Sequence, residues 1–197
     1  MFADTLGNED GATTTLFLQS TQSAKTVHGF TDSAFTTFGG ILTAETGKTL
    51  GNNTKTGLSM EETSEESVGY YTFASTLASG VTVTFTANPM TTTIGEGEGA
   101  VTHYVPYKFK WTKSTGTAGV ADGSIDLGIS TPITDTRPST TAVYSSAAIT
   151  VFTGALPTGP KWASLDLDIQ FDGANNIAYG LPEGTYSGSV VATIAAP

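Results

Sequence analysis

Four segments of the chain alternate between apolar and polar residues with a period of two. They are residues 81–87, 101–111, 163–171 and 185–194. Such alternation is typical of a β-strand with one buried and one exposed face. Antiparallel sheets that pack over a shared core contain strands of this type. Within 101–111, all the odd-numbered residues from Val101 to Trp111 are expected on the buried face.

Weaker patterns predict further strands between turn-forming residues. These strands are expected at 13–19, 24–30, 35–43, 68–76, 124–130 and 147–153. Turn signals include Ala87-Asn88-Pro89 and Asp172-Gly173. No segment carries the apolar stripe of a helix, although Met60 to Ser67 could form one short helical turn.

Many short strands with regular turns predict an all-β fold. We expect an immunoglobulin-like antiparallel β-sandwich, with a jelly-roll-like variant and a closed barrel as alternatives. Residues 21–197 are expected to form a single sandwich domain, and residues 1–20 an N-terminal extended arm.

Composition narrows the classes of protein that fit. The 197 residues include 37 Thr, 17 Ser and 23 Gly, no Cys, and a formal net charge of −10. Threonine suits a strand, and its hydroxyl keeps an outer face hydrated without adding charge. Seven lysines and one arginine are too few for a basic nucleic-acid surface. The chain has no apolar run long enough for a membrane helix, so neither nucleic acid nor membrane insertion is expected.

The residues that could carry chemistry are sparse. His28 and His103 have no second histidine at metal-binding spacing, and no Gly-x-Ser-x-Gly motif occurs. We therefore expect no enzyme activity, no catalytic residues and no cofactor. Asn52 begins the triplet Asn-Asn-Thr, which is the one N-glycosylation acceptor triplet in the chain.

Two acidic groups are candidates for calcium. Asp166, Asp168 and Asp172 are followed by glycine, as in a calcium loop. The apolar residues between them favour instead the outward face of a strand that ends in an Asp-Gly turn. Glu96 and Glu98 lie in a glycine-rich stretch that favours a flexible hairpin loop. No metal site is therefore expected.

The end of the chain carries a family resemblance. Pro182, Gly184 and Tyr186 precede an alternating strand of valine, threonine and small residues up to Ala196. This segment resembles the C-terminal strand of fimbrial and spore-coat-like subunits, in which such a strand closes an immunoglobulin-like sandwich. The absence of the disulfide that chaperone–usher pilins usually carry favours cysteine-free pilin groups or matrix-fibre proteins.

The resemblance implies a filament subunit that receives a strand from its neighbour, which is β-strand addition. The acceptor candidates are Tyr186, Val190, Ala192 and Ile194. In the segment 13–19, the donor candidates are Leu16, Phe17 and Leu18, with Leu16 and Leu18 on one face and Phe17 on the other. The alternative is that 13–19 forms the first strand of its own sandwich.

The sequence is compatible with three functions. The first is a structural subunit of an extracellular, cell-surface filament, a pilus or biofilm-matrix fibre, whose partners are copies of itself. The second is a viral or phage structural protein, such as a decoration or tail protein. The third is a carbohydrate- or surface-binding sandwich, in which aromatic rings would stack on sugars; the alternative is that these rings belong to the core or to a sheet face. The candidate rings are Trp111, Trp162, Tyr70, Tyr71 and Tyr104.

Overall fold

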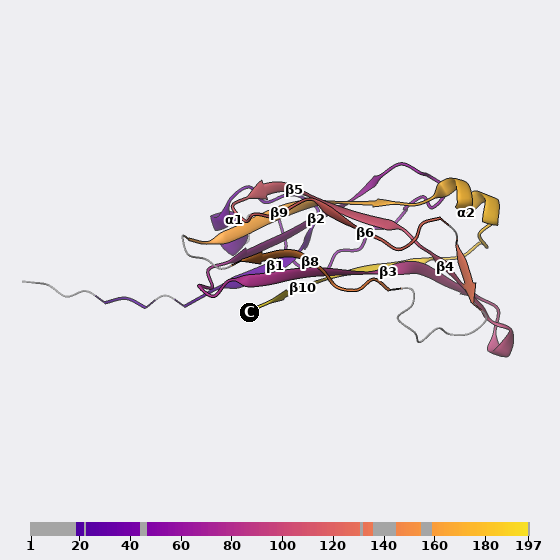
Figure 1. Cartoon of the computed structure of the whole chain (residues 1–197), viewed down its shortest axis with the longest axis horizontal. Coiled ribbons are helices and arrows are strands. Elements are labelled where there is room, and N and C mark those ends of the chain that lie inside the picture. Colours follow the sequence, from indigo (N-terminus) through magenta and orange to yellow (C-terminus); the bar gives the residue numbers. More distant parts are fainter. Residues whose placement is uncertain are drawn as a thin grey trace, which may run out of the picture.

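The protein is a sandwich of two antiparallel sheets (Figure 1). The computed structural model describes residues 19–21, 23–43, 47–130, 132–135, 145–154 and 159–196. The donor candidates Leu16, Phe17 and Leu18 lie outside the described residues, and so does nearly all of the expected arm. The predicted antiparallel all-β sandwich is confirmed.

Sheet A has the strand order β1-β2-β9-β5-β6. Its strands are β1 (Thr26–Thr31), β2 (Glu66–Ser75), β5 (Lys108–Gly116), β6 (Gly123–Asp126) and β9 (Lys161–Gln170). Sheet B has the order β10-β3-β4-β7, and β8 pairs with the β3 edge that β10 leaves open. Its strands are β3 (Val81–Ile94), β4 (Val101–Val105), β7 (Ile133–Asp135), β8 (Ile149–Gly154) and β10 (Ser187–Ala195).

The core between the sheets is built from the residues that alternation placed on the inner faces. Val81, Val83, Phe85 and Ala87 of β3 are buried, and so are Leu165, Leu167, Ile169 and Phe171. An aromatic cluster lies at the centre: the Phe85 ring is 5.1 Å from Tyr71, 5.4 Å from Phe109 and 5.5 Å from Trp111, measured between centroids. Thr82, Thr84 and Thr86 of β3 point outward, and Thr82 hydrogen-bonds Thr153 of β8 at 2.7 Å.

The segment expected as one strand over 101–111 is two strands in different sheets. The chain leaves sheet B at the end of β4 and enters sheet A at β5. Pro106 lies between them and has no N–H for a ladder. The buried Tyr107 crosses the core, and its carbonyl accepts a hydrogen bond from the Leu127 N–H. Val105, Tyr107, Phe109 and Trp111 are buried as expected, because both strands face the same core. The expectation was wrong at the start of β4, where Val101 and His103 are only partly buried and Tyr104 is buried.

Two short helices form where the sequence predicted a strand and a turn. The prediction of a strand over 35–43 was wrong: α1 (Phe38–Thr43) forms there, and the Thr37 hydroxyl accepts a hydrogen bond from the Gly40 N–H. The helix packs Ile41 with Phe35 and Trp162 in a small second cluster. The expectation of no helix also failed after β9, where α2 (Gly173–Tyr179) begins. In Figure 1, α1 and α2 lie at opposite ends of the sandwich.

The turn expected at Ala87-Asn88-Pro89 is not formed, because β3 continues through it to Ile94. Its ladder with β10 has a bulge between Ser187 and Ser189. A Cβ on Gly188 would lie 3.0 Å from the Pro89 carbonyl oxygen, so glycine allows this close approach. A proline is tolerated at such a bulge because it has no N–H to pair. The helical turn considered for 60–67 is not formed either, since Glu66 begins β2.

Candidate functional site: the edge of strand β10

Strand β10 forms one edge of sheet B. All its ladder partners among the described residues lie on β3, from Thr91 at one end to Thr82 at the other. The bulge is confined to the start of β10, and the register from Ser189 to Ala195 is regular. The edge therefore offers a regular run of backbone for pairing with another strand.

The hydrogen bonds of Ala87 reveal which backbone groups of β10 face outward. The Ala87 N–H donates to the Ser146 hydroxyl at 2.8 Å, and the Ser146 N–H donates to the Ala87 carbonyl at 2.9 Å. Ala87 thus directs both groups away from its β10 partner, Val190. Ala87 and Val190 therefore form a non-hydrogen-bonded pair, in which the N–H and C=O groups of both residues point away from the partner strand. Hydrogen-bonded and non-hydrogen-bonded pairs alternate along an antiparallel ladder. The N–H and C=O groups of Val190, Ala192 and Ile194 therefore point toward the edge.

The side chains of the same three residues point inward. Val190, Ala192 and Ile194 are partly buried and pack against the main core, whereas Val191 faces outward with 49% of its surface exposed. Tyr186 precedes β10 and also packs on the core, and its hydroxyl donates to the Pro182 carbonyl at 3.1 Å. All four acceptor candidates from the sequence therefore lie along this edge, on its inner face or at its start.

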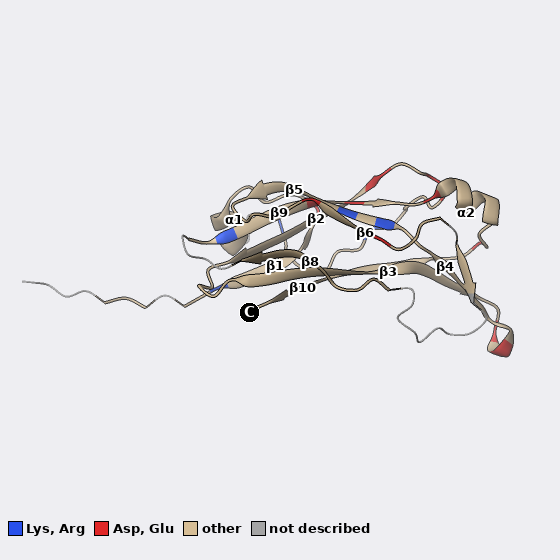
Figure 2. Ribbon diagram, viewed as in Figure 1, with Lys and Arg blue, Asp and Glu red and all other residues tan. Residues whose placement is uncertain are grey.

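Charge is distributed unequally between the two sheets (Figure 2). Strands β3, β4, β8 and β10 contain no Asp, Glu, Lys or Arg, although the chain has a net charge of −10. Sheet A carries lysines on β5 and β9, and acidic residues on β2, β6 and β9. Proteins commonly protect an edge strand with charged residues or proline. Strand β10 has neither, so its edge is open to association.

The other edges are bridged, charged or shorter. Strand β8, whose ladder partners among the described residues all lie on β3, is also uncharged but spans six residues against nine for β10. Strand β1 is bridged by Gly51: the Phe30 N–H donates to the Gly51 carbonyl at 2.8 Å, and the Gly51 N–H donates to the Phe30 carbonyl at 3.2 Å. Strand β6 spans four residues and ends in Asp126, and β7 spans three. Among the described strands, β10 is the longest edge without charge.

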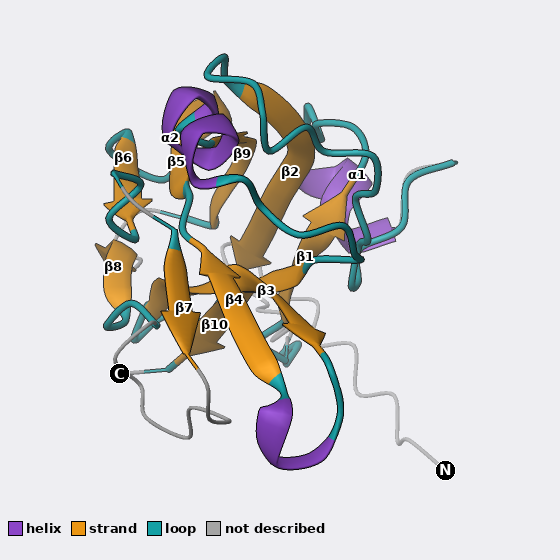
Figure 3. Ribbon diagram, turned by 90° about the vertical axis from the view of Figure 1, so that its right-hand side faces the viewer, coloured by secondary structure: helices purple, strands orange, loops and turns teal. Residues whose placement is uncertain are grey.

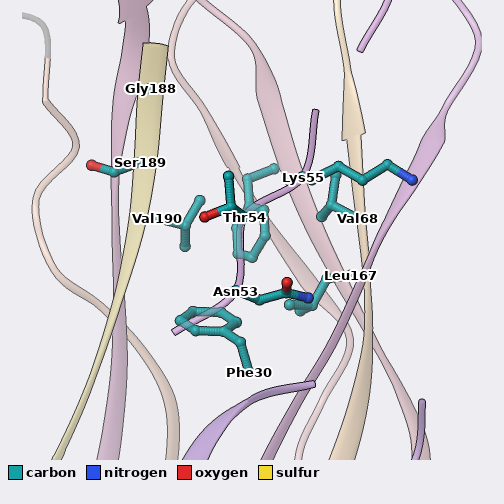
Figure 4. A pocket seen from close by; sticks show the side chains of 10 residues that line it. Phe30, Asn53, Thr54, Lys55, Val68, Leu167, Gly188, Ser189 and Val190 are labelled. Carbon is teal, nitrogen blue, oxygen red and sulfur yellow. The ribbon is translucent and has the colours of Figure 1, made fainter. Parts of the chain in front are cut away.

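A groove runs beside β10, between the edges of the two sheets. We call residues 51–59, which cross this groove, the strap. One cavity of about 240 Å³ lies between strap residues 53–55, Phe30 of β1 and Val190 of β10. A second, of about 380 Å³, lies between strap residues 54–58, Met90 and the lead-in to β10 at Tyr186. In Figure 4, Val190 points from β10 toward Thr54, and the Lys55 side chain extends away from it.

The calcium candidates are not brought together. A short 3-10 helix, η1 (Gly97–Gly99), lies at the tip of the β3–β4 hairpin (Figure 3). Glu96 immediately precedes it, and Glu98 is its middle residue. Asp172 caps helix α2 and accepts a hydrogen bond from the Asn175 N–H at 3.2 Å. The expected Asp-Gly turn is therefore a helix start. The described residues contain no cluster of three or more potential metal-binding side chains.

Asp166 and Asp168 lie on the outer face of sheet A, as the strand interpretation predicted. Asp168 pairs with Lys110 across the ladder, and Lys110 forms an ion pair with Glu65. Partial burial raises the pKa of Asp168, and the carboxylates of Asp166 and Glu65 raise it further, against the opposing effect of Lys110. This group is a charged patch on the face opposite the core.

The two histidines occupy separate places. The His28 Nδ1 atom lies 3.0 Å from the Tyr71 hydroxyl, and partial burial lowers the pKa of His28. His103 lies on β4, with its Nδ1 atom 3.4 Å from the Thr134 hydroxyl.

Most of the aromatic residues considered for sugar stacking are in the interior. Trp111, Trp162, Tyr71 and Tyr104 are buried, and only Tyr70 of the five is partly exposed. These four rings are therefore used for packing and have little face available to a ligand. Asn52, the glycosylation candidate, is exposed at the start of the strap.

The strap is the part of the site that sequence reasoning missed. Gly51-Asn52-Asn53 reads as a turn, but the chain runs on in an extended path beside β10. The available signal is the uninterrupted polar run from Asn52 to Gly57, which is too long for a tight turn.

None of the described helices is long and apolar enough to cross a membrane. Comparison of the chain with protein-family models, curated proteins and solved structures finds no match.

Proposed function

We propose that the protein is a structural subunit of an extracellular filament, and that neighbouring subunits join by β-strand donation. The donor is the segment 13–19 of one copy, and the acceptor is the β10 edge of the next. The observation that carries this proposal is the uncharged edge on which Val190, Ala192 and Ile194 direct their backbone groups outward.

The chemistry of the two segments is complementary. An added strand would form main-chain hydrogen bonds with the outward groups of β10, and alternate side chains would enter the groove. Leu16 and Leu18 are two residues apart, so both would face the groove in an extended strand. At about 3.3 Å per residue, the seven residues 13–19 are long enough to pair with all of 190–194.

The charge distribution also favours contact between copies at this sheet. Copies of a chain with a net charge of −10 repel one another. This repulsion is weakest for a contact between surfaces that carry no charged residue. Donor and acceptor are different surfaces, so the contact is head-to-tail and generates an open filament when the rotation does not close. Because the chain has no cysteine, such a filament would depend on strand pairing and apolar burial.

Removing the donor is the direct test of this function. We expect the full chain to form filaments of regular subunit spacing after unfolding and refolding, as seen by electron microscopy. A chain without residues 1–20 should stay monomeric, because it has no donor strand to pair with the β10 edge of a neighbouring copy.

A synthetic peptide of residues 13–19, added in excess, should shorten the filaments of the full chain by occupying acceptor edges. A peptide with Leu16 and Leu18 replaced by Ser is the matched control and should have little effect. Filaments formed by the truncated chain would exclude the donor assignment. A full chain that never assembles would exclude the filament.

A further inference from the structure

The strap covers the groove that the proposed function requires, but it does not fill it. From Asn52 to Gly57 every strap residue is polar or glycine and exposed to solvent. Apolar side chains line the cavity beneath: Phe30, Val68, Leu167 and Val190. Residues 52–57 of the strap therefore shield apolar surface without supplying an apolar side chain that would pack on it.

The strap is also weakly attached along this stretch. It is bound at its start by the Gly51–Phe30 bridge and by the Asn53 side-chain amide, which donates to Asp32 at 2.7 Å. It is anchored at its end by Leu58 and Met60, which pack on the core. Between these anchors, residues 54–57 have no hydrogen bond to any other described residue. Displacing them would break few interactions.

The strap does not satisfy the edge of β10 either. Strand β10 forms ladder pairs with β3 and none with residues 51–59 in the part of the chain that the structure describes. Thr54 and Lys55 line the cavity beside Val190, yet they leave its outward backbone groups unpaired. An incoming strand would gain both these hydrogen bonds and the apolar surface beneath the strap.

We propose that the strap is a displaceable cover over the acceptor groove, and that residues 54–57 leave the groove when the segment 13–19 of another copy enters. This inference rests on the proposed function and adds a gate to it. A subunit with its strap in place binds a donor weakly, so the strap limits association before the donor strand is seated. The two anchors at Asn53 and Leu58 let the middle of the strap move without unfolding the sheets.

The absence of cysteine allows a clean test by cross-linking. Thr56 of the strap and Thr185 before β10 line the same cavity and are both exposed. The full chain with Thr56→Cys and Thr185→Cys can be stapled with a short, flexible bis-maleimide. The matched control is Thr82→Cys with Thr153→Cys, whose hydroxyls are 2.7 Å apart on the outer face of sheet B. Thermal unfolding before and after stapling checks that each fold is intact.

The readout is binding of a fluorescent peptide of residues 13–19, measured by anisotropy at concentrations where the chain is monomeric. Stapling the strap should weaken binding about tenfold or more, because the apparent Kd rises as the fraction of open groove falls. The outer-face staple should leave binding unchanged. Asn53→Ala, which releases one anchor, should act in the opposite direction and tighten binding.

The outcomes separate the gate from the function beneath it. Equal binding by the strap-stapled and control-stapled proteins, with no effect of Asn53→Ala, would overturn the gate and leave donation to the β10 edge standing. Failure of the peptide to bind any variant, including the unmodified chain, would overturn both. Weaker binding with the strap stapled and tighter binding with Asn53→Ala would support the gate.

Discussion

Replacing Ala192 with proline is expected to abolish filament assembly while leaving the fold intact. The Ala192 N–H points toward the open edge, so its loss breaks no bond to β3. Proline is tolerated in edge strands where the missing N–H would face solvent. For an incoming strand, however, the substitution removes a central hydrogen bond and places a ring at the pairing edge. Electron microscopy and sedimentation of the refolded variant measure assembly, and circular dichroism checks the fold.

Thr193→Pro is the matched control on the neighbouring residue. Thr193 pairs with Thr84 and alternates with Ala192, so its N–H belongs to the β3 ladder. Its loss leaves a carbonyl of β3 unpaired, which we expect to lower the free energy of unfolding by about 1–3 kcal/mol more than Ala192→Pro does. Normal filaments from Ala192→Pro, or equal destabilisation by the two prolines, would contradict the assignment of the open edge.

The largest effect on stability is expected from Phe85→Ala. Phe85 of sheet B is completely buried and packs across the core on aromatic rings of sheet A. Truncation removes apolar burial and leaves a cavity that rigid neighbouring rings cannot close, so the free energy of unfolding should fall by about 3–5 kcal/mol. Urea unfolding followed by tryptophan fluorescence measures the change, since Trp111 packs on Phe85.

Ile149→Ala provides the comparison for Phe85→Ala. Ile149 pairs with Phe85 in the β3–β8 ladder but is 39% exposed. Its truncation should cost no more than about 1 kcal/mol, because it removes less buried surface. A Phe85→Ala variant as stable as Ile149→Ala would show that the aromatic cluster is not the centre of the core.

The fold was predictable where the alternation of apolar and polar residues matches the buried and exposed faces of a strand. The inner faces of β3 from Val81 to Ala87 and of β9 from Leu165 to Ile169 were predicted residue by residue. From Trp162 to Leu165, β9 is buried on both faces, which alternation does not predict. The change of sheet at Pro106 was not predicted, since the alternation keeps its phase through Tyr107. Helices α1 and α2 were missed because six or seven residues are too few to display a helical period. At α2, Asp172-Gly173 is also an ordinary turn signal, and only tertiary packing selects the helix.

The candidate site was partly predictable from the same pattern. Val190, Ala192 and Ile194 were identified as the inner face of the last strand, and they are. That this strand lies at an edge depends on which strands pair, and distant pairings leave no local signal. The strap could not be placed for the same reason: its polar run predicts a loop, and its position over the groove is a tertiary property.

Hydrogen exchange of the β10 amides tests the central claim most directly. In the monomer, the amides of Val190, Ala192 and Ile194 should exchange rapidly, and those of Val191 and Thr193 should be protected by the β3 ladder. On assembly, or on saturation with the peptide of residues 13–19, the first three should become protected and the other two should change little. Filaments in which Val190, Ala192 and Ile194 still exchange as fast as in the monomer would contradict strand addition at β10.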